Sequence, residues 1–183
     1  MTSAKPLMAA MLLALAACQT VTAAAPTPFE AGQPVLTVEG EGLRWILPPN
    51  GAARPLDFGS DQKSVLKSLE FVRGPAGRGV NQDCGAGPVD TANWADGLSL
   101  VFQSGKFVGW GLDRRASKAI GTINGIFPGS TRIELENNFA NVKVFGSTLG
   151  TEFAGGGFYG LLDGTRPTAR ITDMWAGVSC VAR

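Results

Sequence analysis

Ser60 and Lys63 form the sharpest catalytic pattern in this sequence. They stand in the SxxK spacing at the expected start of a helix, where a lysine amine can activate a serine hydroxyl as a nucleophile. The chain contains neither the SDN nor the KTG segment that completes such machinery. A serine near a helix N-cap and a solvated lysine explain the same residues, so we expect no catalytic residue here.

The absence of histidine narrows the remaining chemistry. It excludes Ser-His-Asp and Cys-His catalysis and any His-ligated zinc site. Glycoside hydrolysis or calcium binding would need carboxylates that converge in space. The candidate sets are Asp83, Asp90 and Asp96, or Glu152, Asp163 and Asp173. No EF-hand spacing is present, and Asp-Gly pairs at 96–97 and 163–164 are ordinary turn dipeptides, so we expect no metal and no cofactor.

The segment from Gly155 to Gly160 fits GxGxxG, whose glycines let a backbone approach a pyrophosphate at a helix N-terminus. The following residues, 161–167, include Gly164 and Pro167 and cannot continue as a crossover helix. We therefore expect a glycine-rich loop or strand, not a dinucleotide site.

The four tryptophans are the candidates for an aromatic binding platform: Trp45, Trp94, Trp110 and Trp175. We expect Trp110 and Trp175 to fill the core where helix meets sheet. Trp94 lies among small and polar residues and is the best candidate for an exposed binding surface, close to an expected mobile loop at 74–79.

The N-terminus resembles an export signal. Lys5 precedes an apolar run that is too short to span a bilayer, and the run ends at Leu15-Ala16-Ala17-Cys18, which resembles the lipobox of bacterial lipoproteins. We predict a signal peptide at 1–17, lipid attachment at Cys18 and a flexible linker at 18–33, with cleavage after 23–25 as the alternative. Gln19 after the cysteine implies the outer membrane, facing the periplasm; a soluble periplasmic protein is the alternative.

Cys84 and Cys180 are left as a pair once Cys18 is acylated, and in an oxidising compartment we expect a disulfide between them. Two free thiols at a metal or redox site are the alternative, which lacks a CxxC spacing. The formal net charge is +1 and there is no long basic run, so we expect no binding to nucleic acid or to an anionic membrane surface. We expect contact with the membrane through the lipid anchor only.

The elements that must position these residues are short. An N-terminal hairpin is expected at 34–47, ended by Pro48-Pro49-Asn50-Gly51. Two similar segments follow, in which Gly59-Ser60 and Gly129-Ser130 each precede a short amphipathic helix, and glycine-turned strands come after each helix. We predict a single α+β unit at 34–183, made of pseudo-repeats at about 56–115 and 124–183, each a short helix packed on an antiparallel sheet.

Several motifs resemble uncharacterised secreted lipoproteins of alphaproteobacteria: 83–88 (DCGAGP), 97–100 (GLSL), 125–126 with 129–131, 149–153 (LGTEF) and 175–177 (WAG). That likeness covers most of the chain from about residue 56 and implies no activity. The segments at 58–60 and 127–130 also resemble the repeat of β-lactamase-inhibitor-like proteins and small outer-membrane assembly lipoproteins. Those repeats usually carry a disulfide each, whereas a single pair here would bridge both halves.

We therefore expect a non-catalytic cell-envelope lipoprotein that acts as a protein-binding or assembly module with an envelope protein as its partner. The alternatives are a small periplasmic hydrolase acting on the cell wall and a periplasmic protein that binds a ligand or glycan. The partner and the oligomeric state do not follow from the sequence.

Overall fold

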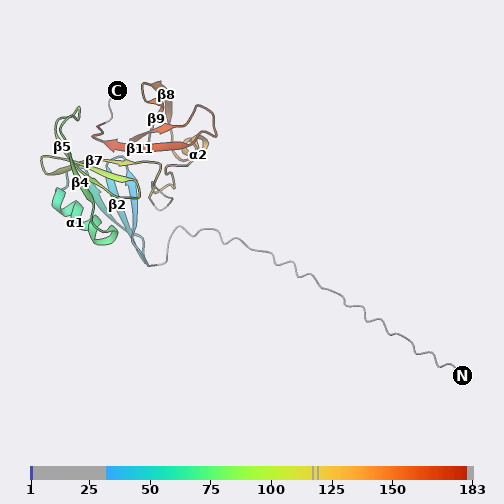
Figure 1. Cartoon of the computed structure of the whole chain (residues 1–183), viewed down its shortest axis with the longest axis horizontal. Helices are drawn as coiled ribbons and strands as arrows, with labels where there is room; N and C mark the ends of the chain where they lie inside the picture. The colour runs from blue at the N-terminus through green and yellow to red at the C-terminus, as the bar shows by residue number, and fades with distance from the viewer. Residues whose placement is uncertain (2–31, 117, 119, 181–183) are drawn as a thin grey trace.

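Two antiparallel sheets form the framework of this computed structural model, which describes Met1 and residues 32–116, 118 and 120–180 (Figure 1). The small sheet has the order β1-β2-β3, with strands at Val35–Glu39, Gly42–Leu47 and Ala52–Asp57. The large sheet has eight strands in the order β4-β5-β6-β7-β11-β10-β9-β8. Its strands are β4 (Gly77–Asn81), β5 (Val89–Asn93), β6 (Leu98–Gln103), β7 (Lys106–Leu112), β8 (Lys143–Ser147), β9 (Gly150–Gly155), β10 (Phe158–Leu162) and β11 (Ile171–Gly177).

The predicted α+β fold class is wrong. Of the described residues, 45% are in strands and 13% in helices, so the structure is β-rich, and the two helices described are short: α1 (Gln62–Arg73) and α2 (Arg132–Asn138). The apolar periodicity that predicts these helices is present, since Val65, Leu66 and Leu69 are buried in α1. The strands β3 and β4 carry mostly exposed side chains and so lack the alternation that would reveal them. The expected hairpin at 34–47 is accordingly part of a three-stranded sheet, and part of the expected loop at 74–79 is the start of β4.

The large sheet consists of two four-stranded meanders that meet where β7 pairs with β11. The segments before α1 and α2 attach to the two meanders by the same hydrogen bonds. Gly59 N–H donates to the Phe107 carbonyl at 2.7 Å, and Gly129 N–H donates to the Ile171 carbonyl at 2.7 Å. The Ser60 carbonyl accepts from the backbone of β7, as the Ser130 carbonyl accepts from β11. Each short helix is thus fixed at its N-terminus by the sheet.

The helix ends show why the chain turns where it does. Asp61 caps α1 by accepting from the Ser64 N–H at 3.0 Å, and Gly74 ends it with a positive φ of 78°. Thr131 and Glu134 form a capping box at the start of α2: the Thr131 side chain accepts from the Glu134 N–H, and the Glu134 side chain accepts from the Thr131 N–H.

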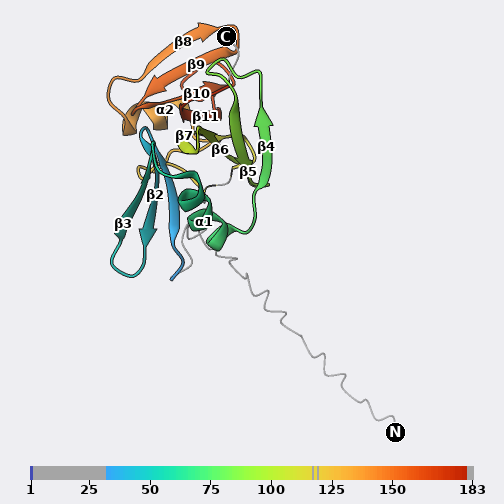
Figure 2. The same cartoon turned by 90° about the vertical axis from the view of Figure 1, so that its left-hand side faces the viewer.

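One hydrophobic core lies between the large sheet on one side and the small sheet with both helices on the other. α1 and the small sheet lie on the same side of the large sheet in both views (Figures 1 and 2). The largest fully buried side chains of the large sheet include Trp110, Phe102, Phe107, Phe153 and Phe158. Trp110 also joins the two sheets, because its indole N–H donates to the Glu39 carbonyl at 2.7 Å.

Candidate functional site

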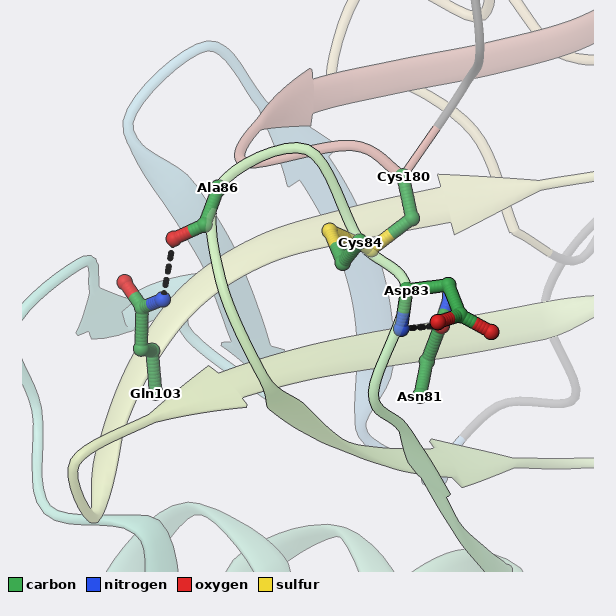
Figure 3. The surroundings of a disulfide bond; sticks show 6 residues. All are labelled: Asn81, Asp83, Cys84, Ala86, Gln103 and Cys180. Atoms are coloured by element: carbon green, nitrogen blue, oxygen red, sulfur yellow. Dashed lines mark hydrogen bonds between the residues drawn. A yellow bond between two sulfur atoms is a disulfide. The ribbon is translucent and has the colours of Figure 1, made fainter.

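The predicted disulfide is present. Cys84 follows β4 and Cys180 follows β11, and the bond between them closes a sequence separation of 96 residues (Figure 3). Gln103 holds the Cys84 loop from the other side, because its side-chain amide donates to the Ala86 carbonyl at 2.7 Å. The sulfurs pack in a small apolar cluster with Val89, Val101, Val108 and Val178, separate from the main core. A disulfide fits an exported protein in an oxidising compartment. Cys18, the signal peptide at 1–17 and most of the linker lie outside the described residues.

The outer face of the large sheet, which we define as the face turned away from α1, α2 and the small sheet, carries the other candidate features. Strand alternation assigns side chains to it: Met174 and Ala176 belong to the main core, so Trp175 between them points outward. Tyr159 does so between the buried Phe158 and Gly160. Trp175 is buried, as expected, with 6% of its surface exposed, but it lies on the outer side of the sheet and not in the main core, which contains Trp110.

A single register row crosses the outer face over all eight strands. In sheet order it consists of Gly77, Asn93, Ser99, Gly111, Trp175, Tyr159, Ala154 and Lys143. The β4–β7 half of this row has only small or polar side chains, whereas the β10–β11 part is aromatic. Tyr159 and Trp175 stack with their ring centroids 6.5 Å apart and an interplanar angle of 15°. The row therefore changes from two stacked rings, of which Tyr159 is exposed and Trp175 is 6% exposed, to small or polar side chains. We call the two rings the aromatic ridge.

A groove of about 370 Å³ lies beside this ridge on the outer face. Its floor lies at Gly111, directly paired with Trp175, and the Ser99 hydroxyl donates to the Gly111 carbonyl at 3.3 Å. A Cβ at position 111 would lie 2.8 Å from the Ser99 hydroxyl oxygen, so a larger residue there would displace the Ser99 side chain. Leu149 and Leu161 add apolar lining, and the segment that carries Cys180 borders the groove.

Two carboxylates lie at one end of the groove. Asp113 directly follows β7 and Asp173 lies on β11, and both adjoin the paired residues Leu112 and Met174, so they occupy neighbouring positions. Asp113 accepts hydrogen bonds from the backbone N–H and the guanidinium of Arg115, the shortest at 2.5 Å. These hydrogen bonds, with the charge of Arg115, lower the pKa of Asp113 below its usual value. Asp113 is therefore held as an anion, which is unsuited to a general acid.

The structure does not bring together the other acidic residues named from the sequence. Asp96 pairs with Arg73, and Asp163 accepts from the Arg170 N–H at 2.8 Å, so both serve local structure. Glu152 is buried in β9, and of its predicted set only Asp173 lines the groove. Among the described residues, no cluster of three or more histidine, cysteine, aspartate or glutamate side chains is suited to a metal ion.

The SxxK and GxGxxG segments have structural roles. Ser60 is half-buried and its backbone bridges to β7, while Lys63 is exposed on the first turn of α1. Gly156 and Gly157 form the β9–β10 turn with positive φ values of 61° and 82°. This segment is therefore a β-hairpin turn and not the start of a helix, in agreement with the expected glycine-rich loop or strand.

The prediction of Trp94 as an exposed binding surface is wrong. Trp94 is 6% exposed, and its indole N–H donates to the Gly74 carbonyl at 3.0 Å. The Arg73 guanidinium lies 6.0 Å from the ring centroid, which covers the indole further. The small residues around Trp94 in the sequence leave room for the C-terminal end of α1 to pack over it.

The residues that form the groove were missed because apolar side chains occupy both faces of β10 and β11. The alternation of apolar and polar residues along these strands therefore does not show which face of the sheet Tyr159 or Trp175 lies on. Gly111 pairs with Trp175, which is 64 positions later in the sequence. No pattern within a short stretch of sequence predicts such a pairing.

Comparison with protein-family models, with curated proteins and with solved structures finds no match to this chain. The resemblance to alphaproteobacterial secreted lipoproteins and to the inhibitor-like repeat stays a prediction. No helix among residues 32–116, 118 and 120–180 has the length and apolar character to cross a bilayer.

Proposed function

We propose that this chain is a non-catalytic lipoprotein of the cell envelope that binds a protein partner on the outer face of its large sheet. The observation that carries the proposal is the aromatic ridge beside the glycine-floored groove. Tyr159 is 42% exposed on this face, and Phe145 on β8 is 41% exposed. Aromatic side chains are enriched in protein interfaces because they bury large areas at a small cost in side-chain entropy.

The extent of this surface favours a macromolecular partner over a small ligand. The groove alone has the volume of a small-ligand site. Phe145 lies beyond it, however: it pairs with Glu152, which in turn pairs with Leu161 at the groove. Apolar surface on β8 would stay in water if only the groove were filled. A partner that inserts a side chain beside Trp175 and covers Tyr159 and Phe145 would bury both the ridge and the exposed ring on β8.

The other functions have less support. Hydrogen bonds keep Asp113 ionised, so this carboxylate is unsuited to be the general acid of a hydrolase. Glycan binding depended on the expectation that Trp94 is exposed, but Trp94 is buried. Attachment to the membrane through Cys18 and a position on the periplasmic side of the outer membrane belong to this proposal; mass spectrometry of the mature protein tests the acylation.

Site-specific photo-crosslinking in cells tests the binding face. A photoreactive amino acid replaces Tyr159 in one strain and Ile123, which is 60% exposed on a loop outside the large sheet, in the control strain. We expect a discrete protein adduct from position 159 only, and its loss when the crosslinker at 159 is combined with Phe145→Ala. Adducts of equal yield from both positions, or none from 159, would contradict the proposal.

The affinity of the identified partner for variants of this face then measures how much the exposed rings contribute to binding. The variant Tyr159→Ala/Phe145→Ala removes two exposed rings, and we expect binding to weaken by roughly 30-fold or more, the loss typical of interface hot spots. Ile133→Ala on α2, whose side chain is 48% exposed, is the matched control and should leave binding unchanged.

A further inference from the structure

The end of α1 exposes two adjacent apolar side chains. Phe71 is 91% exposed and Val72 is 43% exposed, although the same helix buries Val65, Leu66 and Leu69 against the core. Phe71 continues a stripe at four-residue spacing that begins with Lys63 and Lys67, so the aromatic ring and two amines share one face of the helix. The helix therefore has a second face, turned away from the core, that combines an apolar ring with positive charges.

Two hollows flank Phe71 and gather positive charge around it. The larger one, of about 450 Å³, lies between α1 and the small sheet and is lined by Trp45, Leu47, Arg54, Lys67, Phe71 and Val72 among others. The other is lined by Lys63, Lys67, Glu70, Phe71 and Arg78. Glu70 is already paired with Arg78 at 2.6 Å. Arg54, Lys63 and Lys67 therefore leave a net positive charge around the exposed ring.

The chain enters the fold at this same place. Pro34, directly before β1, lines the larger hollow together with Phe71 and Val72. Cys18 precedes Pro34 by 16 positions, a reach of at most about 55 Å at full extension. A bilayer that holds an acyl chain on Cys18 is thus within reach of the α1 face without the linker having to pass around the domain. In both views α1 lies near the start of β1, which is drawn in blue (Figures 1 and 2).

We propose that the face of α1 around Phe71 docks on an anionic phospholipid bilayer. Phe71 and Val72 enter the headgroup region, and Arg54, Lys63 and Lys67 face the lipid phosphates. This inference rests on the proposed function, because it requires the lipid anchor at Cys18. It also sets the orientation of the protein: α1 and the outer face lie on opposite sides of the large sheet, so docking turns the aromatic ridge away from the membrane.

A spin label measures this docking in the full mature lipoprotein. Phe71→Cys places one nitroxide on the proposed face, since Cys84 and Cys180 are joined and Cys18 carries the lipid. Tyr159→Cys is the matched control on the outer face. The acylated protein is reconstituted into vesicles of phosphatidylethanolamine and phosphatidylglycerol, and accessibility to oxygen is compared with accessibility to a water-soluble nickel chelate.

We expect the label at 71 to gain oxygen accessibility and to lose nickel accessibility in vesicles, while the label at 159 keeps its values from detergent solution. The change Lys63→Gln/Lys67→Gln should lower the ratio of docked to undocked protein by roughly fivefold per lysine, and Lys143→Gln on β8 should not. Equal nickel accessibility at 71 and 159 in vesicles would overturn the docking and leave the partner-binding proposal intact.

Two other results would overturn the inference by showing a different occupant. A label at 71 that is already immobilised in detergent would assign the hollow to the chain's own N-terminal segment, and dipolar broadening between labels would assign it to a second copy. If the protein does not stay with floated vesicles, the lipid anchor at Cys18 is contradicted, and so is the docking that depends on it. Photo-crosslinking at position 159 reports on partner binding independently of all these results.

Discussion

Removal of the Cys84–Cys180 disulfide should cause a large loss of stability that can be calculated in advance. The bond closes a loop of 96 residues in the unfolded chain. The chain-entropy model gives a stabilisation of about 4.7 kcal/mol at 25 °C for a loop near 100 residues. Measured losses on removing native disulfides are about 2–5 kcal/mol, so we expect Cys84→Ala/Cys180→Ala to lower the free energy of unfolding by about 3–5 kcal/mol. A domain of this size has only about 5–15 kcal/mol in total.

Calorimetry and urea unfolding of the oxidised protein, the reduced protein and the double variant measure this loss. At about 2–4 °C per kcal/mol for a domain of this length, Tm should fall by roughly 6–20 °C, and equally for reduction and for substitution. The folded spectra should not change, because the effect lies in the unfolded state. Val101→Ala, in the same apolar cluster, is the control for local packing and should cost less. A fall in Tm below about 3 °C for the double variant would refute the loop-entropy reasoning.

Three further predictions concern the fold that carries the outer face. Trp110→Phe removes the indole hydrogen bond to the Glu39 carbonyl and should cost about 1–3 kcal/mol in urea unfolding; an unchanged midpoint would mean that the bond does not hold the two sheets together. Gly109→Ala should destabilise by more than 1 kcal/mol, because its Cβ would lie 2.1 Å from the Val178 carbonyl oxygen, whereas Gly146→Ala meets nothing within 4 Å and should be neutral within about 1 kcal/mol; similar effects of the two would contradict the packing at the β7–β11 junction. Hydrogen bonds from the Thr131 backbone and hydroxyl lower the pKa of Glu134 below 4.5, so the stability that they add is present at neutral pH and is lost as pH falls through the lowered pKa. NMR titration should therefore show the pKa of Glu134 rise in Thr131→Ala, a change that should also cost about 1 kcal/mol at pH 7, and an unmoved pKa would contradict the capping box.

Local features were predictable where a few neighbouring residues decide them. Thr131 with Glu134 predicts the start of α2, Gly74 predicts the end of α1, and the cysteine count predicts the disulfide. Each rests on hydrogen bonds or covalent chemistry that needs no knowledge of the distant chain. The fold class failed because β3 and β4 have few apolar side chains and become strands by pairing with a neighbour, an energy that does not appear in their own sequence.

All four tryptophans are buried, and packing decided where each one lies. Trp94 has polar and small neighbours in the sequence, yet the end of α1 covers it and Gly74 accepts its N–H. Trp175 has apolar neighbours, yet it faces outward because alternation along β11 gives the core to Met174 and Ala176.

The sequence by itself determines the absence of histidine chemistry, the pairing of two cysteines and the ends of two short helices, because composition and contacts within a few residues fix them. Only the tertiary structure decides the groove and the charged face of α1. The groove exists because β7 and β11 pair Gly111 with Trp175, and the positive face exists because β3 brings Arg54 beside Lys67. The groove depends on the register of two strands that are distant in the sequence, and the positive face depends on the packing of α1 beside the small sheet. Both are set by burial of the core and not by any local run of residues.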